Sequence, residues 1–123
     1  MQTAIATADL GVRELTRLFR ALGDETRLRI VALLAHGELC VCHIVTALDL
    51  SQPNASRQLG ILRMNGVVDA RRDGTWVYYR IADQEHAAVE TMLDTLTRAF
   101  GAESAIRADH AKLRKACGPG ACK

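Results

Sequence analysis

The hydrophobic pattern of this chain changes at Gly66, and the change limits the folds that the chain can adopt. Before Gly66, apolar residues recur at the spacing of one face of an α-helix. After it, an Asp73-Gly74 pair separates two runs of β-prone residues, which is a strong signal for a β-hairpin. Helical spacing returns beyond Asp83. The pattern predicts a mainly α-helical chain with one small hairpin, and 123 residues suit a single domain of this kind.

Four helices are expected before the hairpin. The first ends at Gly23, and Asp24 can cap the second, because a short polar side chain can accept a hydrogen bond from a free N–H of the first turn. A short third helix is expected at about 41–48. Ser51 can cap a fourth helix, and the Asn65-Gly66 pair ends it.

The hairpin and the helices after it carry further expectations. Asp73 and Gly74 are expected to occupy the hairpin turn with positive φ angles. Asp83 can cap the next helix. That helix carries an apolar stripe, which we expect to form a dimer surface; burial within the same chain is the alternative. The stripe consists of Val89, Met92, Leu93, Leu96 and Phe100. A further polar helix is expected over 104–116.

Positive charge gathers in one part of the chain. The chain has 16 Lys and Arg residues and 14 Asp and Glu residues, and a net charge of +2 does not by itself indicate a nucleic-acid partner. Between Ser51 and Arg80, however, five arginines and two aspartates give a charge of +3. This local excess of arginine favours a surface that faces phosphate, with a solvated polar face as the alternative.

The sequence contains no signal for a membrane or for secretion. No segment approaches the roughly 18–20 apolar residues of a membrane span, and the first eight residues lack the pattern of a secretory signal. We therefore expect a cytoplasmic protein. In that reducing compartment, its four cysteines are more typical of metal binding or redox chemistry than of structural disulfides.

The third and fourth helices have the order of a helix-turn-helix, with Asp49-Leu50-Ser51 as the turn. The fourth helix opens with short hydrogen-bonding side chains followed by Arg57. Such a surface suits the major groove, where Asn and Gln can read adenine and Arg can read guanine. The hairpin would then be a wing, with Arg71, Arg72 and Thr75 near phosphates or the minor groove.

Three motifs in this order resemble the ArsR/SmtB family of metal-sensing repressors, over roughly residues 10 to 100. They are Phe19-Arg-Ala-Leu-Gly-Asp-Glu-Thr-Arg-Leu-Arg-Ile30, Leu50-Ser-Gln-Pro-Asn-Ala-Ser-Arg-Gln-Leu59 and Gly74-Thr-Trp-Val-Tyr-Tyr-Arg80. The resemblance implies a winged helix-turn-helix fold and a homodimer built through the first and last helices. It also implies binding to a palindromic operator in double-stranded DNA. Residues 1–116 are then the DNA-binding and dimerisation domain.

The resemblance also assigns the residues that contact DNA. On the fourth helix they are Gln52, Asn54, Ser56 and Arg57, with Ser51 at the start of the same surface, and on the wing they are Arg71 and Arg72. The chain departs from the family at Gln58, where many members have histidine.

Glu38-Leu39-Cys40-Val41-Cys42-His43 resembles the arsenic-type signature of the family. The physical argument for a thiol site also stands alone. Cys40 is expected at a helix N-terminus and Cys42 in the first turn, where exposed N–H groups and the helix dipole favour the thiolate. Thiolates select soft ions such as Cu(I), Cd, Pb or As(III). The alternative is that the two cysteines are small buried hydrophobic residues.

Two thiolates leave a three-coordinate site incomplete. The family's arsenic pattern often has a third cysteine at the position where this chain has Val45. Cys117 and Cys122 are the obvious replacements, since they lie in a segment, 117–123, that is expected to be a flexible tail. Three thiolates would suit As(III), and four would suit Cd, Pb or Zn. The alternative is a disordered tail with idle cysteines.

The sequence therefore predicts a repressor that is not an enzyme and that leaves its operator when As(III) binds cysteine thiolates. Cd, Pb, Zn or Sb(III) is an alternative inducer. In a second alternative, Cys40 or Cys42 forms a disulfide with a tail cysteine, which makes the repressor redox-responsive. A third alternative is an enzyme or thiol carrier, for which the chain has neither a Cys-x-x-Cys pair nor a convincing nucleophile–base arrangement.

Overall fold

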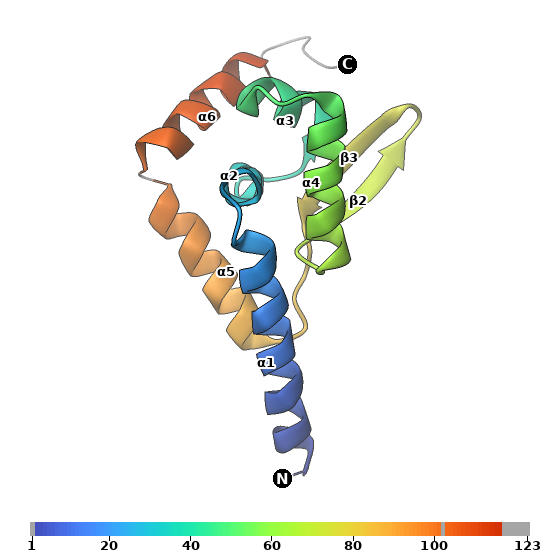
Figure 1. Ribbon diagram of the computed structural model, residues 1–123, viewed down its shortest axis with the longest axis vertical. Helices are drawn as coiled ribbons and strands as arrows, with labels where there is room; N and C mark the ends of the chain where they lie inside the picture. Colours follow the sequence, from blue (N-terminus) through green and yellow to red (C-terminus); the bar gives the residue numbers. More distant parts are fainter. Residues whose placement is uncertain (1, 102, 117–123) are drawn as a thin grey trace.

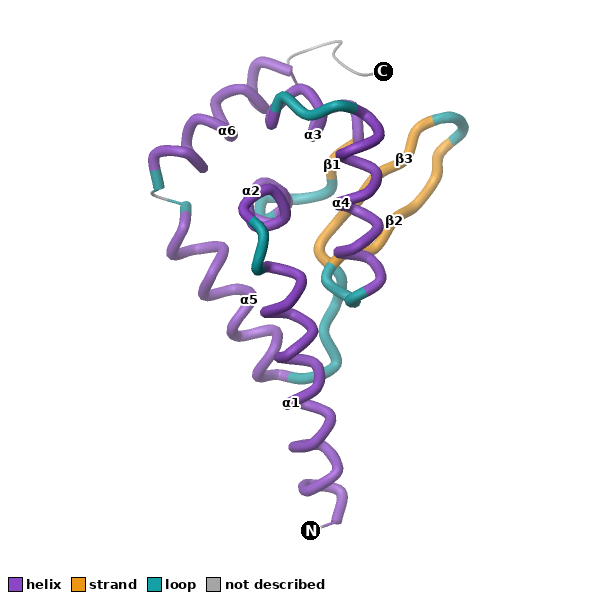
Figure 2. The backbone as a smooth tube through the Cα atoms, in the orientation of Figure 1, coloured by secondary structure: helices purple, strands orange, loops and turns teal. Residues whose placement is uncertain are grey.

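The computed structural model describes residues 2–101 and 103–116, in which six helices and one small sheet are formed (Figures 1 and 2). The predicted mainly α-helical fold with a small hairpin is confirmed. The helices are α1 (Gln2–Leu22), α2 (Glu25–Leu34), α3 (Val41–Leu48), α4 (Gln52–Met64), α5 (Ala87–Phe100) and α6 (Ser104–Ala116). The strands are β1 (Leu39–Cys40), β2 (Val68–Asp73) and β3 (Trp76–Ile81).

Helix α2 lies at the centre of the molecule. Figure 1 looks almost along its axis, with the other helices arranged around it. Its second half, Ile30–Leu34, is buried on every side. The Asp24 cap predicted for this helix is confirmed, because its Oδ2 accepts a hydrogen bond of 3.1 Å from the N–H of Arg27.

The three strands are antiparallel in the order β1-β3-β2. In the hairpin, Asp73 pairs with Trp76, so the two-residue turn is Gly74-Thr75. The prediction that Asp73 and Gly74 both occupy the turn with positive φ was therefore wrong. Gly74 alone supplies the positive φ, 62°, at the first turn position, as in a type II′ turn. One face of β3, carrying Val77, Tyr79 and Ile81, packs on the core as the alternation predicts.

Strand β1 was not predicted, because two residues are too short to show a period. It pairs Leu39 with Tyr79 and Cys40 with Tyr78. The segment that carries the first cysteine is therefore joined directly to the hairpin.

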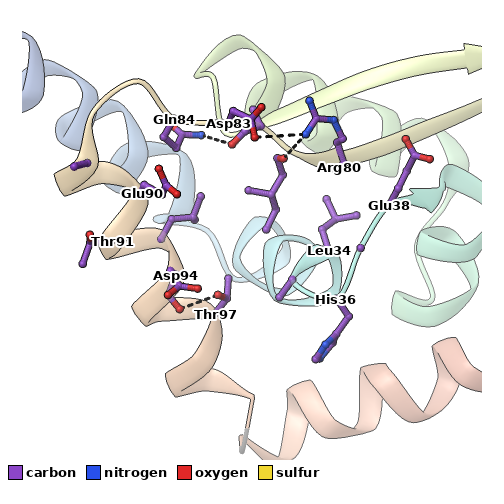
Figure 3. Close-up of a pocket in the computed structure, with 16 residues that line it drawn as sticks. Leu34, His36, Glu38, Arg80, Asp83, Gln84, Glu90, Thr91, Asp94 and Thr97 are labelled. Atoms are coloured by element: carbon purple, nitrogen blue, oxygen red, sulfur yellow. Dashed lines mark hydrogen bonds and ion pairs between the residues drawn. The ribbon is translucent and has the colours of Figure 1, made fainter.

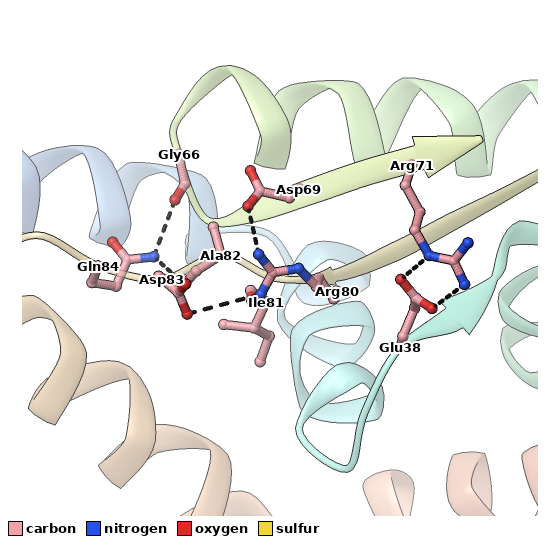
Figure 4. Close-up of polar contacts among 9 residues, drawn as sticks. All are labelled: Glu38, Gly66, Asp69, Arg71, Arg80, Ile81, Ala82, Asp83 and Gln84. Carbon is pink, nitrogen blue, oxygen red and sulfur yellow. Dashed lines mark hydrogen bonds and ion pairs between the residues drawn. The ribbon is translucent and has the colours of Figure 1, made fainter. Parts of the chain in front are cut away.

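The start of α5 differs from the sequence prediction. The helix begins at Ala87, with His86 at the N-cap position, and Asp83 is exposed in the preceding loop. Two contacts hold this loop in a non-helical course. The Ala82 N–H donates to the Val67 carbonyl, and the Gln84 side chain donates to the carbonyl oxygens of Gly66 and Ala82 (Figure 4).

The apolar stripe of α5 is divided between the core and the surface. Val89 and Leu93 are buried against their own chain, and Leu96 packs on the same core. The expectation that the whole stripe forms a dimer surface is therefore corrected for these residues. Met92 remains 38% exposed on α5. On α1, which packs beside α5, Val12 is 64% exposed and Phe19 is 50% exposed.

Helix α6 closes the described part of the chain and packs against α2 and α3. Its Asp109 is only 2% exposed and accepts two hydrogen bonds from the Arg29 guanidinium, at 2.6 and 2.9 Å. No helix in residues 2–101 and 103–116 is long and apolar enough to cross a membrane.

Candidate DNA interface and thiol site

Helices α3 and α4 are joined by the three-residue turn that was predicted, Asp49-Leu50-Ser51. Asp49 adopts a left-handed conformation with φ of 54°, which aspartate tolerates better than most residues. The N–H groups of Asp49 and Leu50 both donate to the Val45 carbonyl. The turn is therefore well defined, and it sets the direction of α4 relative to α3.

The first turns of α4 present polar side chains to solvent. Ser51 is the N-cap, and its Oγ accepts a hydrogen bond of 3.2 Å from the Asn54 N–H. Gln52, Ser56 and Arg57 are exposed. Asn54 is half-buried, and its Oδ1 accepts hydrogen bonds from Arg57 and Gln58. The predicted helix residues therefore form one surface, on which the carbonyl oxygen of Asn54 already has two donors.

Gln58 serves the fold and not the exposed surface. It is only 8% exposed, and its Oε1 accepts a hydrogen bond of 2.9 Å from Arg27 of α2. Arg27 is fixed in turn, because its Nε donates to the Ala21 carbonyl at 2.6 Å. This Arg27–Gln58 contact, which the sequence reasoning missed, attaches α4 to the central helix.

The two wing arginines occupy opposite faces of the hairpin, because neighbouring residues of a strand alternate in direction. Arg71 makes a two-pronged ion pair with Glu38, at 2.6 and 2.7 Å (Figure 4). Its guanidinium lies 4.5 Å from the centre of the Tyr78 ring. These hydrogen bonds lower the pKa of the Glu38 carboxyl below its ordinary value. Arg72 is exposed, and no ion pair is recorded for it within the described part of the chain.

Cys40 and Cys42 meet where β1 runs into α3. Cys40 is the N-cap residue and is only 2% exposed, while Cys42 is half-buried in the first helical turn. Their Sγ atoms lie 3.0 Å apart. Two thiolates on one tetrahedral ion at about 2.3 Å would lie about 3.8 Å apart, so a small change would let both bind one ion. Ion binding through these sulfur atoms requires their reduced form.

His43, next to the pair, is half-buried. Its Nε2 is buried and has no hydrogen-bond partner among the described residues. Burial lowers the pKa of this imidazole below its ordinary value, which favours the neutral form.

A complete ion site is not formed by the described residues. No group of three or more His, Cys, Asp or Glu side chains in 2–101 and 103–116 could hold a metal ion. Cys117 and Cys122, which were predicted to complete the site, lie outside the described residues. Val45, at the position of the family's third cysteine, packs against the core. The last described helix, α6, nevertheless packs on α3, which has Cys40 at its N-cap and Cys42 in its first turn.

A further pocket formed by the described residues lies elsewhere. Its volume is about 900 Å³, and it is bounded by the segment between α2 and β1, the end of β3 and one side of α5 (Figure 3). Glu38, Arg80, Asp83, Glu90 and Asp94 contribute charges of both signs to its lining. Neither cysteine of the pair lines this pocket.

Comparisons with known proteins agree on one family. A model described as "Bacterial regulatory protein, arsR family" matches residues 24–70. The arsenical resistance operon repressor of Escherichia coli (strain K12) is 48% identical over 83 residues, which are 67% of this chain and 71% of that protein. The cadmium resistance transcriptional regulatory protein CadC of Listeria innocua is 43% identical over 75 residues, 60% of this chain and 63% of that protein.

A solved structure gives the same result for the fold. It is the homodimeric winged helix-turn-helix DNA-binding domain of Mb0332 from Mycobacterium bovis, a possible ArsR-family transcriptional regulator. The TM-score is 0.61 and the identity 35%, over 74% of this chain and 84% of that one. These similar proteins are transcriptional regulators and not enzymes.

Proposed function

This chain belongs to the arsR family of bacterial regulatory proteins and is a transcriptional repressor with a winged-helix fold, and we propose that arsenite is its inducer. In this proposal, the reduced protein binds a palindromic operator in the cytoplasm. It leaves the operator when As(III) binds cysteine thiolates.

One observation carries the proposal: the Cys40 and Cys42 sulfur atoms lie 3.0 Å apart at the start of the first helix of the helix-turn-helix. Two soft sulfur ligands select soft ions over Mg or Ca. The helix N-terminus favours the thiolate, which is the form that binds an ion. The likeness to an arsenical resistance repressor supports As(III) among the soft ions.

The third ligand is proposed to be Cys117 or Cys122. Helix α6 packs on α3, and Cys117 follows Ala116, the last residue of α6, in the sequence. The helix that precedes the tail cysteines in the sequence therefore packs on the helix that has Cys40 at its N-cap and Cys42 in its first turn. Three sulfur ligands would suit the pyramidal geometry of As(III).

Release of DNA would begin at the first turn of α3. Cys40 caps this helix and Cys42 lies within its first turn, so turning both thiolates toward one ion changes the helix start. Helix α3 leads through the Asp49-Leu50-Ser51 turn to α4, which carries the proposed reading surface. The ion can favour release only by binding the DNA-free conformation more tightly, and a coupling of about 1–3 kcal/mol, or roughly 5–150-fold, is typical.

The proposed DNA-contacting residues lie on two elements. Those on α4 are Ser51, Gln52, Asn54, Ser56 and Arg57, and those on the wing are Arg71 and Arg72. The resemblance implies a homodimer through the first and last helices, and we assign the second of these to α5, which carries the apolar stripe, and not to α6. A homodimer formed through α1 and α5 would present two such surfaces to the two halves of a palindrome. The exposed apolar side chains on these two helices support this arrangement.

Two alternatives each have an observation in their favour. The likeness to a cadmium resistance regulator favours Cd, Pb or Zn as inducer, bound by four thiolates. The packing of α6 on α3 favours a redox-responsive repressor, in which oxidation joins Cys40 or Cys42 to a tail cysteine in place of ion binding. Both alternatives keep the DNA-binding surface unchanged.

The experiment is a titration of the reduced repressor–operator complex with arsenite, with cadmium and with peroxide. We expect arsenite to release the operator from the wild type. Cys40→Ser and Cys42→Ser should abolish release while leaving operator affinity within about twofold. The Cys117→Ser/Cys122→Ser variant should weaken release.

The outcomes separate the proposals. Release by cadmium but not by arsenite would assign a different inducer, and release by peroxide alone would make the thiols a redox switch. A normal arsenite response in the Cys117→Ser/Cys122→Ser variant would rule out a tail cysteine as the third ligand.

A further inference from the structure

The guanidinium of Arg71 binds the Glu38 carboxylate with the geometry that it would use to bind a DNA phosphate. Its Nε donates to Glu38 Oε2 at 2.7 Å and its Nη2 donates to Glu38 Oε1 at 2.6 Å (Figure 4). This two-pronged geometry is also the one that arginine uses for phosphate oxygens. The same pair of N–H groups cannot serve both anions, so Glu38 and a DNA phosphate would compete for Arg71.

The ion pair lies where DNA could reach it. The Arg71 side chain is 54% exposed and the Glu38 side chain 29%. Because solvent already reaches both groups, exchange of one anion for the other requires no unfolding of the hairpin. The Tyr78 ring supports the guanidinium from one side, 4.5 Å away, and would support it with either partner.

Glu38 belongs to the segment that carries the thiols. It lies two residues before Cys40, which pairs with Tyr78 in the sheet. Tyr78 in turn pairs with Arg71 on the other side of β3. Residues that pair directly share one face of a sheet, so Cys40, Tyr78 and Arg71 form a row across the three strands. A change in the position of Cys40 could therefore alter the Glu38–Arg71 ion pair directly, through neighbouring residues of the sheet.

We propose that Glu38 is an internal competitor for DNA, which withholds Arg71 from the phosphate backbone and links the thiol segment to the wing. This inference rests on the proposed function for its ion dependence only. When Glu38 holds Arg71, the wing loses a phosphate contact. When a DNA phosphate binds Arg71, the ion pair that joins Glu38, and with it the start of α3, to the wing is broken.

The test measures binding to a short labelled duplex of random sequence, at several salt concentrations, for the wild type, Glu38→Gln, Arg71→Gln and the double variant. Random sequence suffices, because phosphate contacts do not depend on base identity. We expect Glu38→Gln to tighten binding about threefold, and to steepen the slope of log affinity against log salt by about 0.9, because one phosphate contact is gained. The double variant should show no gain over Arg71→Gln.

Asp69→Asn is the matched control, since Asp69 lies on β2, the strand of Arg71, and this variant also removes one negative charge. Its partner is Arg80, at 3.3 Å, and not Arg71. We expect a much smaller effect from this variant. The proposal would be overturned if Asp69→Asn raised the affinity for DNA equally, or if Glu38→Gln still raised it in the Arg71→Gln background. Either result would mean that Glu38 acts only by repelling the negative charge of DNA. No gain from Glu38→Gln would also overturn it.

The ion dependence is tested with the operator. Arsenite should weaken operator binding by a smaller factor in Glu38→Gln than in the wild type, and an unchanged factor would contradict the link to the thiols. Failure of the wild type to respond to arsenite would instead contradict the proposed function. The measurements on the random duplex would still show whether Glu38 competes with phosphate for Arg71.

Discussion

Ser51 has two consequences at the scale of a single residue, because it both starts α4 and lies on the surface proposed to face DNA. Its Oγ accepts the Asn54 N–H, one of the N–H groups that a helix start leaves without a partner. Replacing it therefore changes the stability of the fold as well as the chemistry of the surface. A stability measurement is needed before any loss of DNA binding is attributed to a lost contact.

Ser51→Ala is expected to lower the free energy of unfolding by about 1 kcal/mol, because the N-cap hydrogen bond is lost. Urea unfolding at neutral pH measures this change. Ser56→Ala is the matched control, since Ser56 is exposed on the same helix and does not cap it. It should alter stability by less than about 0.5 kcal/mol. Equal effects of the two variants would mean that the cap does not stabilise α4.

Residue roles that depend on near neighbours could be predicted from the sequence. The Asp24 and Ser51 caps are of this kind, because each acts on an N–H three positions away. The partners of Arg27 and Arg71 could not be predicted. Gln58 is 31 positions from Arg27, and Glu38 is 33 positions from Arg71, so only the folded chain brings these side chains together. Their charge and polarity alone indicated only a polar surface.

At the scale of elements, α6 packs on α3 and is joined to α2 by a buried ion pair. Asp109 is buried and binds the Arg29 guanidinium of α2 through both carboxylate oxygens. Ile106 is buried on the same helix. Because α6 also packs on α3, this ion pair helps to position the helix that precedes the tail cysteines against α3.

Asp109→Asn is expected to lower the free energy of unfolding by about 2 kcal/mol. The loss is smaller than the roughly 3–5 kcal/mol typical of a fully buried pair, because the Arg29 side chain is 29% exposed and keeps some water. Glu25→Gln is the control, since Glu25 faces the same arginine at 3.8 Å but is 85% exposed. It should cost less than about 0.5 kcal/mol. Thermal and urea unfolding would measure both, and equal losses would contradict the role given to Asp109.

Helices with a recognisable apolar period and a capping residue were predicted well, and an element without a pattern of its own was not. The bounds of α3, 41–48, agree with the prediction, and the capped start of α4 does too. Strand β1 was missed, because its two residues are defined by pairing with β3 and not by a pattern of their own. The start of α5 was misplaced at Asp83, because Gln84 holds the preceding loop through carbonyl groups that are distant in sequence.

At the scale of the whole molecule, two faces have different characters. The start of α4 and the tip of the hairpin lie toward the same side in Figure 1, where the proposed DNA-contacting residues are. Helices α1 and α5 run side by side away from them. The proposed dimer face is therefore separate from the proposed DNA face. The sequence could not divide the α5 stripe between core and surface, because periodicity shows which residues are apolar but not what covers them.

This separation makes the dimer testable without altering the reading surface. Met92 is 38% exposed on α5, and a charge there would be desolvated if α1 and α5 form the interface. Met92→Glu is expected to raise the dimer dissociation constant by about tenfold or more, which sedimentation equilibrium measures. Operator affinity should fall with it, because one subunit reads only half of a palindrome. Met64→Glu is the control, since Met64 is 83% exposed at the end of α4, and it should leave the dimer intact. A Met92→Glu protein that remains as dimeric as the wild type would place the interface elsewhere.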